Sequence, residues 1–149
     1  MKPYVLFVFI LMFPAAMICY GQAGSPSKAF KAFEDESTNK ITILWISGDR
    51  NVFMESIEPY CNACFKNKDY DELTLMAWGS SICLLAKDKN LQRELKTLIN
   101  KGLDVKASRF LTEKYSCTEI LKNMGVEIGN MNEILTDFLK DKNRKLVSL

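Results

Sequence analysis

Apolar residues along this chain form short runs that alternate with stretches of helical spacing. The run 41–47 is almost entirely β-branched or large and apolar, which is typical of a strand buried on both faces of a parallel sheet. A helical pattern follows over 51–66, where Pro59 must kink the helix or restart it. The pattern predicts further strands at 73–78, 103–109, 126–128 and 145–149, and further helices at 80–86, 91–99, 112–124 and 134–139.

Strand and helix alternate throughout residues 41–149, a length typical of one domain. Such alternation favours parallel strands joined by helices that cross over the sheet. We therefore predict an α/β fold, a three-layer α/β/α sandwich around a mostly parallel five-stranded sheet. The strand at 103–109 alternates apolar and polar residues, so one side of the sheet is expected to be partly wet there.

The N-terminal region has the features of a secretory signal peptide. Lys2 precedes a long apolar run, and small and polar residues follow it up to Ala23. We predict a signal peptide at 1–23 with cleavage near Ala23, and hence a periplasmic or secreted protein. An uncleaved anchor is the alternative, and it would be the protein's only contact with a membrane. Residues 24–40 are mostly polar and charged, so we expect them to form a flexible leader.

Charge and residue usage exclude several functional classes. The net charge of +2 falls to +1 when residues 1–23 are removed with their single charge, Lys2. A nearly neutral chain gives no electrostatic basis for nucleic-acid binding. The chain has no histidine, so serine–histidine and cysteine–histidine catalysis are excluded and the commonest metal ligand is missing. We predict neither a metal site nor a cofactor.

Four cysteines remain after cleavage of the signal peptide. Cys61 and Cys64 have two main interpretations. They either lie on the buried face of a kinked helix, or form a redox pair in the first turn of a helix restarted by Pro59, where the helix dipole lowers a thiol pKa. A third, a zinc site, would need two more ligands that only the Cys83 and Cys117 thiolates could supply. Cys83 and Cys117 lie on apolar helix faces and are expected in the core. A disulfide is permitted in an oxidising compartment, but the sequence does not define its pairing.

Polar residues gather where the predicted strands end. Ligands of parallel α/β folds bind at the carboxyl ends of strands, and backbone N–H groups with serine and arginine side chains suit an anion such as a sulfur oxyanion or small carboxylate. The candidate anion-binding residues are Asp49, Arg50, Ser80, Ser81, Ser108 and Arg109. In the alternative interpretation the serines only form turns and caps, Asp49 is an N-cap, and the arginines are solvated or paired.

The order of several motifs resembles one known family. The motifs, in chain order, are Trp45-x-Ser47-Gly48-Asp49-Arg50, Leu73-Thr-Leu-Met-Ala-Trp78-Gly79, Gly102-Leu-Asp-Val105, Gly125-Val-Glu-Ile128 and Leu135-Thr-Asp-Phe-Leu-Lys140. In this order and spacing, residues 41–149 resemble the DsrE/DsrF-like (YchN-like) sulfur-relay proteins. The resemblance implies a five-stranded parallel sheet between helices, and assembly into trimers or hexamers.

The resemblance also implies where sulfur chemistry would occur. In active members of that family, a cysteine just after the third strand carries sulfur as a persulfide, often with a second cysteine three residues further on. Ser108 and Leu111 occupy these positions here. A serine hydroxyl cannot hold a transferable persulfide sulfur, so this chain resembles a divergent member without the usual active-site cysteine.

Two functional hypotheses follow. The first is that the chain is an exported, non-catalytic protein that binds a small anion or a protein partner. It would assemble as a homo-oligomer or as a hetero-oligomer with a related subunit. The second is a sulfur carrier or thiol redox protein that uses Cys117 or the Cys61/Cys64 pair, with a sulfur-carrier protein as its partner.

Overall fold

The computed structural model describes residues 39–149, so the predicted signal peptide and nearly all of the predicted leader lie outside the described residues. Five strands form one sheet in the order β4-β3-β2-β1-β5, and every neighbouring pair is parallel. They are β1 (Lys40–Trp45), β2 (Glu72–Ala77), β3 (Asp104–Ser108), β4 (Glu127–Gly129) and β5 (Arg144–Ser148). The predicted α/β sandwich with a five-stranded sheet is confirmed, and the sheet is parallel throughout.

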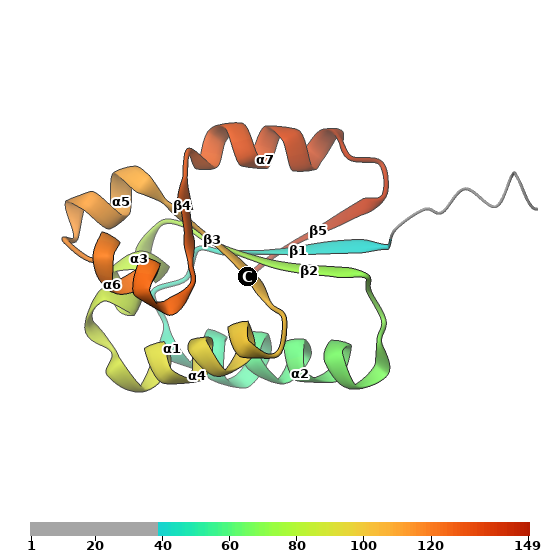
Figure 1. The fold of residues 1–149 in the computed structure, drawn as a ribbon, viewed down its shortest axis with the longest axis horizontal. Helices are drawn as coiled ribbons and strands as arrows, with labels where there is room; N and C mark the ends of the chain where they lie inside the picture. Colours follow the sequence, from blue (N-terminus) through green and yellow to red (C-terminus); the bar gives the residue numbers. More distant parts are fainter. Residues whose placement is uncertain (1–38) are drawn as a thin grey trace, which may run out of the picture. The chain divides into compact units, whose positions relative to one another are not determined.

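Helices cover both faces of this sheet. Figure 1 shows α7 on one face and α1, α2 and α4 on the other, with α3, α5 and α6 toward the carboxyl ends of the strands. The helical segments are α1 (Arg50–Val52), the π-helical η2 (Phe53–Ile57), α2 (Glu58–Asn67), α3 (Ser80–Lys87), α4 (Lys89–Asn100), α5 (Arg109–Lys114), α6 (Thr118–Met124) and α7 (Met131–Lys140). The chain must return from one edge of the sheet, β4, to the other, β5, and this reversal places α7 on the opposite face.

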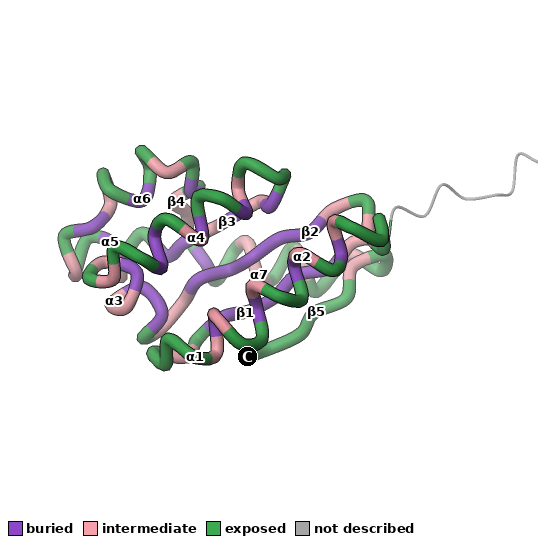
Figure 2. The backbone as a smooth tube through the Cα atoms, turned by 90° about the horizontal axis from the view of Figure 1, so that it is seen from below, coloured by how far each residue is buried: buried purple, intermediate pink, exposed green. Residues whose placement is uncertain are grey.

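The apolar core lies between one face of the sheet and the helical segments η2, α2 and α4, and α3 and α6 also contribute buried residues to it. Alternate residues of the central strands point into it, as the period of a strand requires. Figure 2 shows buried residues along β1 and β2 and an exposed β5 at the edge. The core includes Ile41, Ile43 and Trp45 of β1, Leu73 and Leu75 of β2, Val105 of β3, and Leu91, Leu95 and Leu98 of α4.

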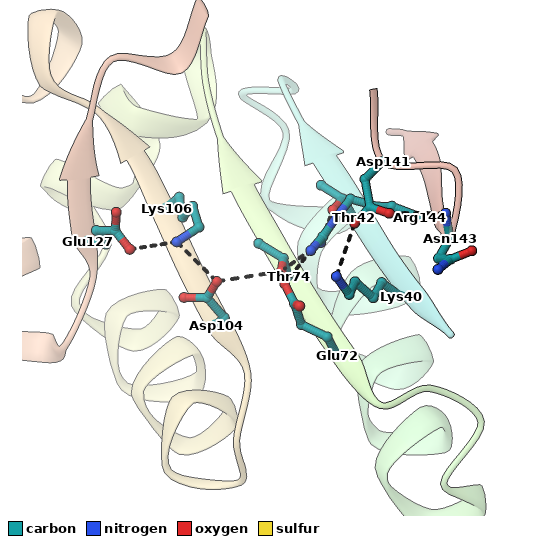
Figure 3. Close-up of polar contacts among 10 residues, drawn as sticks. All are labelled: Lys40, Thr42, Glu72, Thr74, Asp104, Lys106, Glu127, Asp141, Asn143 and Arg144. Atoms are coloured by element: carbon teal, nitrogen blue, oxygen red, sulfur yellow. Dashed lines mark hydrogen bonds and ion pairs between the residues drawn. The ribbon is translucent and has the colours of Figure 1, made fainter. Parts of the chain in front are cut away.

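The other face of the sheet, which α7 covers, carries polar side chains at the beginnings of the central strands, followed by the apolar pair Leu44 and Met76. Thr42 and Thr74 are completely buried there, and the Arg144 side chain is 4% exposed. The guanidinium of Arg144 donates to Thr42 Oγ1 at 2.9 Å, to Thr74 Oγ1 at 3.3 Å and to Glu72 Oε1 at 2.5 Å (Figure 3). It also stacks 3.9 Å from the centre of the Phe138 ring of α7. Arg144 therefore joins three strands to the helix above them.

The polar contacts continue toward β4. The Lys106 ammonium lies 3.2 Å from Asp104 Oδ2 and 2.5 Å from Glu127 Oε2 (Figure 3). Burial works to lower the pKa of Lys106, but the hydrogen bond to Glu127 and the charge of Asp104 outweigh it and raise that pKa. The partly wet side predicted for the third strand is this face.

Two predicted elements differ from the structure. The first strand is buried on both faces as predicted, Thr42 included, but it ends at Trp45, two residues earlier than expected. The single helix predicted over 112–124 is two helices, α5 and α6, because the chain turns at Ser116 with φ 53° in the left-handed region. Within α6, Leu121 is buried as predicted, whereas Ile120, expected on the same buried face, is 36% exposed.

The helix predicted over 51–66 is present with interruptions. It begins as a short α-helical turn, continues as η2, and becomes regular again in α2 with Pro59 in its first turn. The backbone stays helical from η2 into α2, so Pro59 lies where the wider π-helical turn gives way to the regular α-helix. Among residues 39–149, no helix combines the length and apolar character that crossing a membrane requires.

Candidate functional site

A pocket of about 490 Å³ lies at the carboxyl edge of the sheet, where β2, β3 and β4 end. Its walls come from three segments of the chain: Trp78 after β2, the start of α5 after β3, and the start of α7 after β4. The strand order β4-β3-β2 brings these segments together. The pocket therefore occupies the position where parallel α/β folds bind ligands.

Short turns from strand to helix position the polar side chains of the pocket. Ser108 ends β3 and directly precedes α5, so Arg109 lies in the first turn of that helix. After β4, Asn130 caps α7 by accepting a hydrogen bond from the backbone N–H of Asn132 at 3.2 Å. Both asparagines line the pocket. The pocket thus joins the beginnings of two helices.

The side chains in this pocket are available to a ligand. Ser108 is 6% exposed, and no hydrogen bond of its hydroxyl occurs within the described part of the chain. Arg109 and Glu113 are exposed and lie one helical turn apart, and no ion pair between them occurs among residues 39–149. Phe110, 73% exposed, provides an aromatic surface beside them. Together these groups offer a cation, a carboxylate, a hydroxyl and the Asn132 amide around an aromatic wall. The Asn130 amide is engaged, because its Oδ1 caps α7 and its Nδ2 donates to Glu133 Oε1 at 2.8 Å.

Of the six predicted anion-binding residues, Ser108 and Arg109 line this pocket. Ser80 and Ser81 do not, because their hydroxyls serve the fold. Ser80 Oγ donates to the carbonyl of Ile46 at 2.7 Å, and Ser81 Oγ lies 2.9 Å from the carbonyl oxygen of Trp45. These bonds fasten the start of α3 to the end of β1.

Asp49 and Arg50 also lie at the carboxyl edge, but outside the pocket. Asp49 caps α1 by accepting from the backbone N–H of Asn51 at 2.8 Å. Arg50 donates from Nε to Asp88 Oδ2 at 3.0 Å. Asp88 in turn caps α4, and hydrogen bonds from that helix, together with Arg50, hold its pKa below the usual value.

Sequence reasoning missed the contribution of Trp78, Phe110, Glu113, Asn130 and Asn132 to the site. One local signal was present, because Asn130 follows the predicted strand 126–128 after a single glycine, and asparagine is a typical N-cap. Phe110 and Glu113 lie one and four residues after Arg109. No pattern in the neighbouring sequence indicates that their side chains face the same pocket.

The candidate thiols lie outside the pocket, and all are free cysteines. Cys61 is completely buried in α2, and burial, with the nearby Cys64 and Glu58, raises its pKa to about 12. Burial likewise raises the pKa of Cys64 and of Cys117. Cys117 precedes α6, and its Sγ lies 3.6 Å from the carbonyl oxygen of Thr112. These environments favour the neutral thiol, whereas nucleophilic cysteines act as thiolates.

Within residues 39–149, no group of three or more cysteine, aspartate or glutamate side chains is placed to hold a metal ion.

Comparison with known proteins defines the α/β fold more narrowly. No protein-family model and no curated protein matches the chain. Among solved structures, a conserved protein of unknown function from Bacteroides thetaiotaomicron is similar, with a TM-score of 0.70 and 24% identity over 74% of this chain and 95% of that one. The YchN protein of Escherichia coli is also similar, with a TM-score of 0.53 and 17% identity over 74% of this chain and 99% of that one. The chain has a DsrE/YchN-like fold, and identities this low show the fold alone.

Proposed function

We propose that this chain is an exported, non-catalytic protein of DsrE/YchN-like fold that binds a small anion in the pocket at the carboxyl edge of its sheet. The observation that carries the proposal is the composition of the pocket. A guanidinium, a hydroxyl and an amide line it, from Arg109, Ser108 and Asn132, with Asn130 beside them as the cap of α7, and none of the four described cysteines lines it. As the sequence predicts, the protein would be exported through its N-terminal signal and would assemble with like or related subunits.

Arg109 supplies the charge for this function. A guanidinium binds carboxylates and sulfur oxyanions through two parallel N–H donors, which makes such bonds stronger than neutral ones. The hydroxyl of Ser108 can donate to the same anion. Glu113 lies in the same pocket and repels a ligand that is anionic throughout. The preferred ligand is therefore a small carboxylate or oxyanion that also carries a hydrogen-bond donor.

Isothermal titration calorimetry of the purified chain tests the proposal, with succinate, malate and thiosulfate as probes. We expect Arg109→Gln to weaken binding by roughly 10- to 100-fold, since hydrogen bonds to a charged group contribute about 1.5–3 kcal/mol. Arg50→Gln is the matched control, because Arg50 lies at the same edge of the sheet but is paired with Asp88. Malate, which has a hydroxyl, should bind more tightly than succinate.

Equal losses in both arginine variants would show that the anion binds elsewhere or without specificity. No heat of binding with any of the three probes in the unmodified chain would refute a small-anion site of this kind.

The alternative function is sulfur transfer or redox chemistry at Cys117 or at the Cys61/Cys64 pair. Their raised pKa values and their burial count against it in the folded state. The decisive measurement is polysulfide treatment of the reduced native protein, followed by alkylation and peptide mass spectrometry. A stoichiometric persulfide on Cys117 or Cys61 that passes to an acceptor would replace the anion-binding proposal.

A further inference from the structure

A stripe of cations runs along the solvent-facing side of α4. Lys89, Arg93 and Lys96 are exposed and lie four and three residues apart, so they share one side of this twelve-residue helix. Ion pairs within residues 39–149 involve none of the three. Lys89 and Arg93 donate only to neutral amides, of Gln92 at 3.4 Å and Asn90 at 2.6 Å.

The stripe forms one wall of a groove between α4 and α6, with a volume of about 380 Å³. The other wall is apolar. Ile120 is 36% exposed in it, and Met124 is half-buried. No acidic side chain of the described residues lines this α4–α6 groove. One wall thus carries uncompensated positive charge while the other presents apolar surface to solvent.

We propose that the α4–α6 groove is the docking site for an acidic amphipathic segment of a protein partner. Apolar side chains of the segment pack on Ile120 and Met124, and its carboxylates face the ammonium and guanidinium groups of α4. The stripe covers about 10 Å at 1.5 Å per residue, which matches about two turns of an incoming helix. An amphipathic helix in a groove is a recurrent mode of peptide recognition.

The shape of the groove favours a peptide over a membrane surface. Binding to a bilayer places apolar side chains outward, where they enter the interface between headgroups and acyl chains. Here the apolar residues form the inner wall of a concave surface that a side chain can enter. The groove shares no lining residue with the pocket at the carboxyl edge, so this proposal does not depend on the proposed anion site.

Fluorescence anisotropy with the purified chain tests the docking site. The probe is a labelled twelve-residue peptide of glutamates with leucines at helical spacing, and its partner probe has glutamine in place of every glutamate. We expect the glutamate peptide to bind at least tenfold more tightly than the glutamine peptide, and added salt to reduce the difference. The triple variant Lys89→Gln/Arg93→Gln/Lys96→Gln should weaken its binding about tenfold, from three exposed pairs of about 0.5 kcal/mol each.

The matched control is Lys66→Gln/Lys68→Gln/Lys142→Gln, which removes three exposed lysines outside the groove and should leave binding unchanged. Ile120→Asn tests the apolar wall and should weaken binding several-fold while the charges remain. Circular dichroism confirms that each variant is folded. The proposal is overturned if the glutamate peptide does not bind, if the two triple variants lose equal affinity, or if the protein binds phosphatidylserine vesicles but not the peptide.

Discussion

Replacing Arg144 by leucine tests whether the polar face of the sheet is a structural network. The guanidinium is almost fully buried and donates to Thr42, Thr74 and Glu72. Its loss leaves two buried threonine hydroxyls without this donor and removes the contact with the Phe138 ring. Breaking a buried ion pair from one side costs about 3–5 kcal/mol. Because the Glu72 side chain is 37% exposed and can regain water, we expect a loss of about 3 kcal/mol.

Urea unfolding followed by tryptophan fluorescence measures this loss of free energy. With a slope of about 2 kcal/mol per molar urea, the midpoint should fall by about 1.5 M. Arg93→Leu is the control, because Arg93 is exposed, and we expect a change within about 0.5 kcal/mol. Glu72→Gln should cost about 1 kcal/mol alone and almost nothing when Arg144 has already been replaced. Equal effects of Arg144→Leu and Arg93→Leu, or an additive double variant, would refute the reasoning.

The same pair predicts a dependence of stability on pH. Burial works to raise the pKa of Glu72, but the hydrogen bond and charge of Arg144 outweigh it and lower that pKa. A lowered carboxyl pKa contributes stability above the unfolded value of about 4.3, and the contribution is lost as pH falls through the folded value. The stability difference between the unmodified chain and Glu72→Gln should therefore shrink below about pH 4.

Three further predictions concern thiols, a turn and a lysine. Alkylation of the native protein at pH 8 should modify half-buried Cys83 much faster than Cys61, because burial raises the pKa of Cys61 to about 12. Unfolding in urea should abolish this difference in rate. Equal rates in the native protein would contradict the burial argument. Gly79→Ala should destabilise the fold by about 1–2 kcal/mol in urea unfolding. Gly79 has φ 69°, and a Cβ at this position would lie 3.3 Å from the Ile46 carbonyl oxygen. An unchanged urea midpoint would exclude backbone strain at this turn. Lys106→Met should lower the free energy of unfolding by about 1 kcal/mol. Because folding raises the pKa of Lys106, the stability that this lysine adds should be lost above about pH 10, so the difference between the unmodified chain and the variant should shrink there. Parallel curves of stability against pH would contradict this.

The strands could be predicted because their signal is local. Each predicted strand overlaps an observed one, including the short β4, since runs of apolar residues bounded by turn residues identify strands without knowledge of their neighbours. Helix continuity was less well determined. Spacings of three, four and seven from Cys117 to Met124 fit one long helix, but they fit equally a new helix that starts after the turn at Ser116.

The pocket was only partly predictable for a different reason. Ser108 and Arg109 follow a strand directly, so the rule that ligands bind at carboxyl ends identified them from sequence. The same rule also selected Ser80 and Ser81, whose hydroxyls the tertiary structure uses to hold α3 against β1. Asn130 joins the pocket because β4 lies beside β3, and strand order is a property of the whole sheet.

The sequence by itself determined the fold class, the five strands and the absence of histidine chemistry, because each depends on composition or on neighbours along the chain. Only the tertiary structure decided that Arg144 meets Glu72 across β1, and that two helix beginnings enclose one pocket. The thiol environments were decided in the same way, since the pKa of a cysteine depends on burial and on nearby charges. Such contacts join residues far apart in the chain, and no local pattern of residues specifies them.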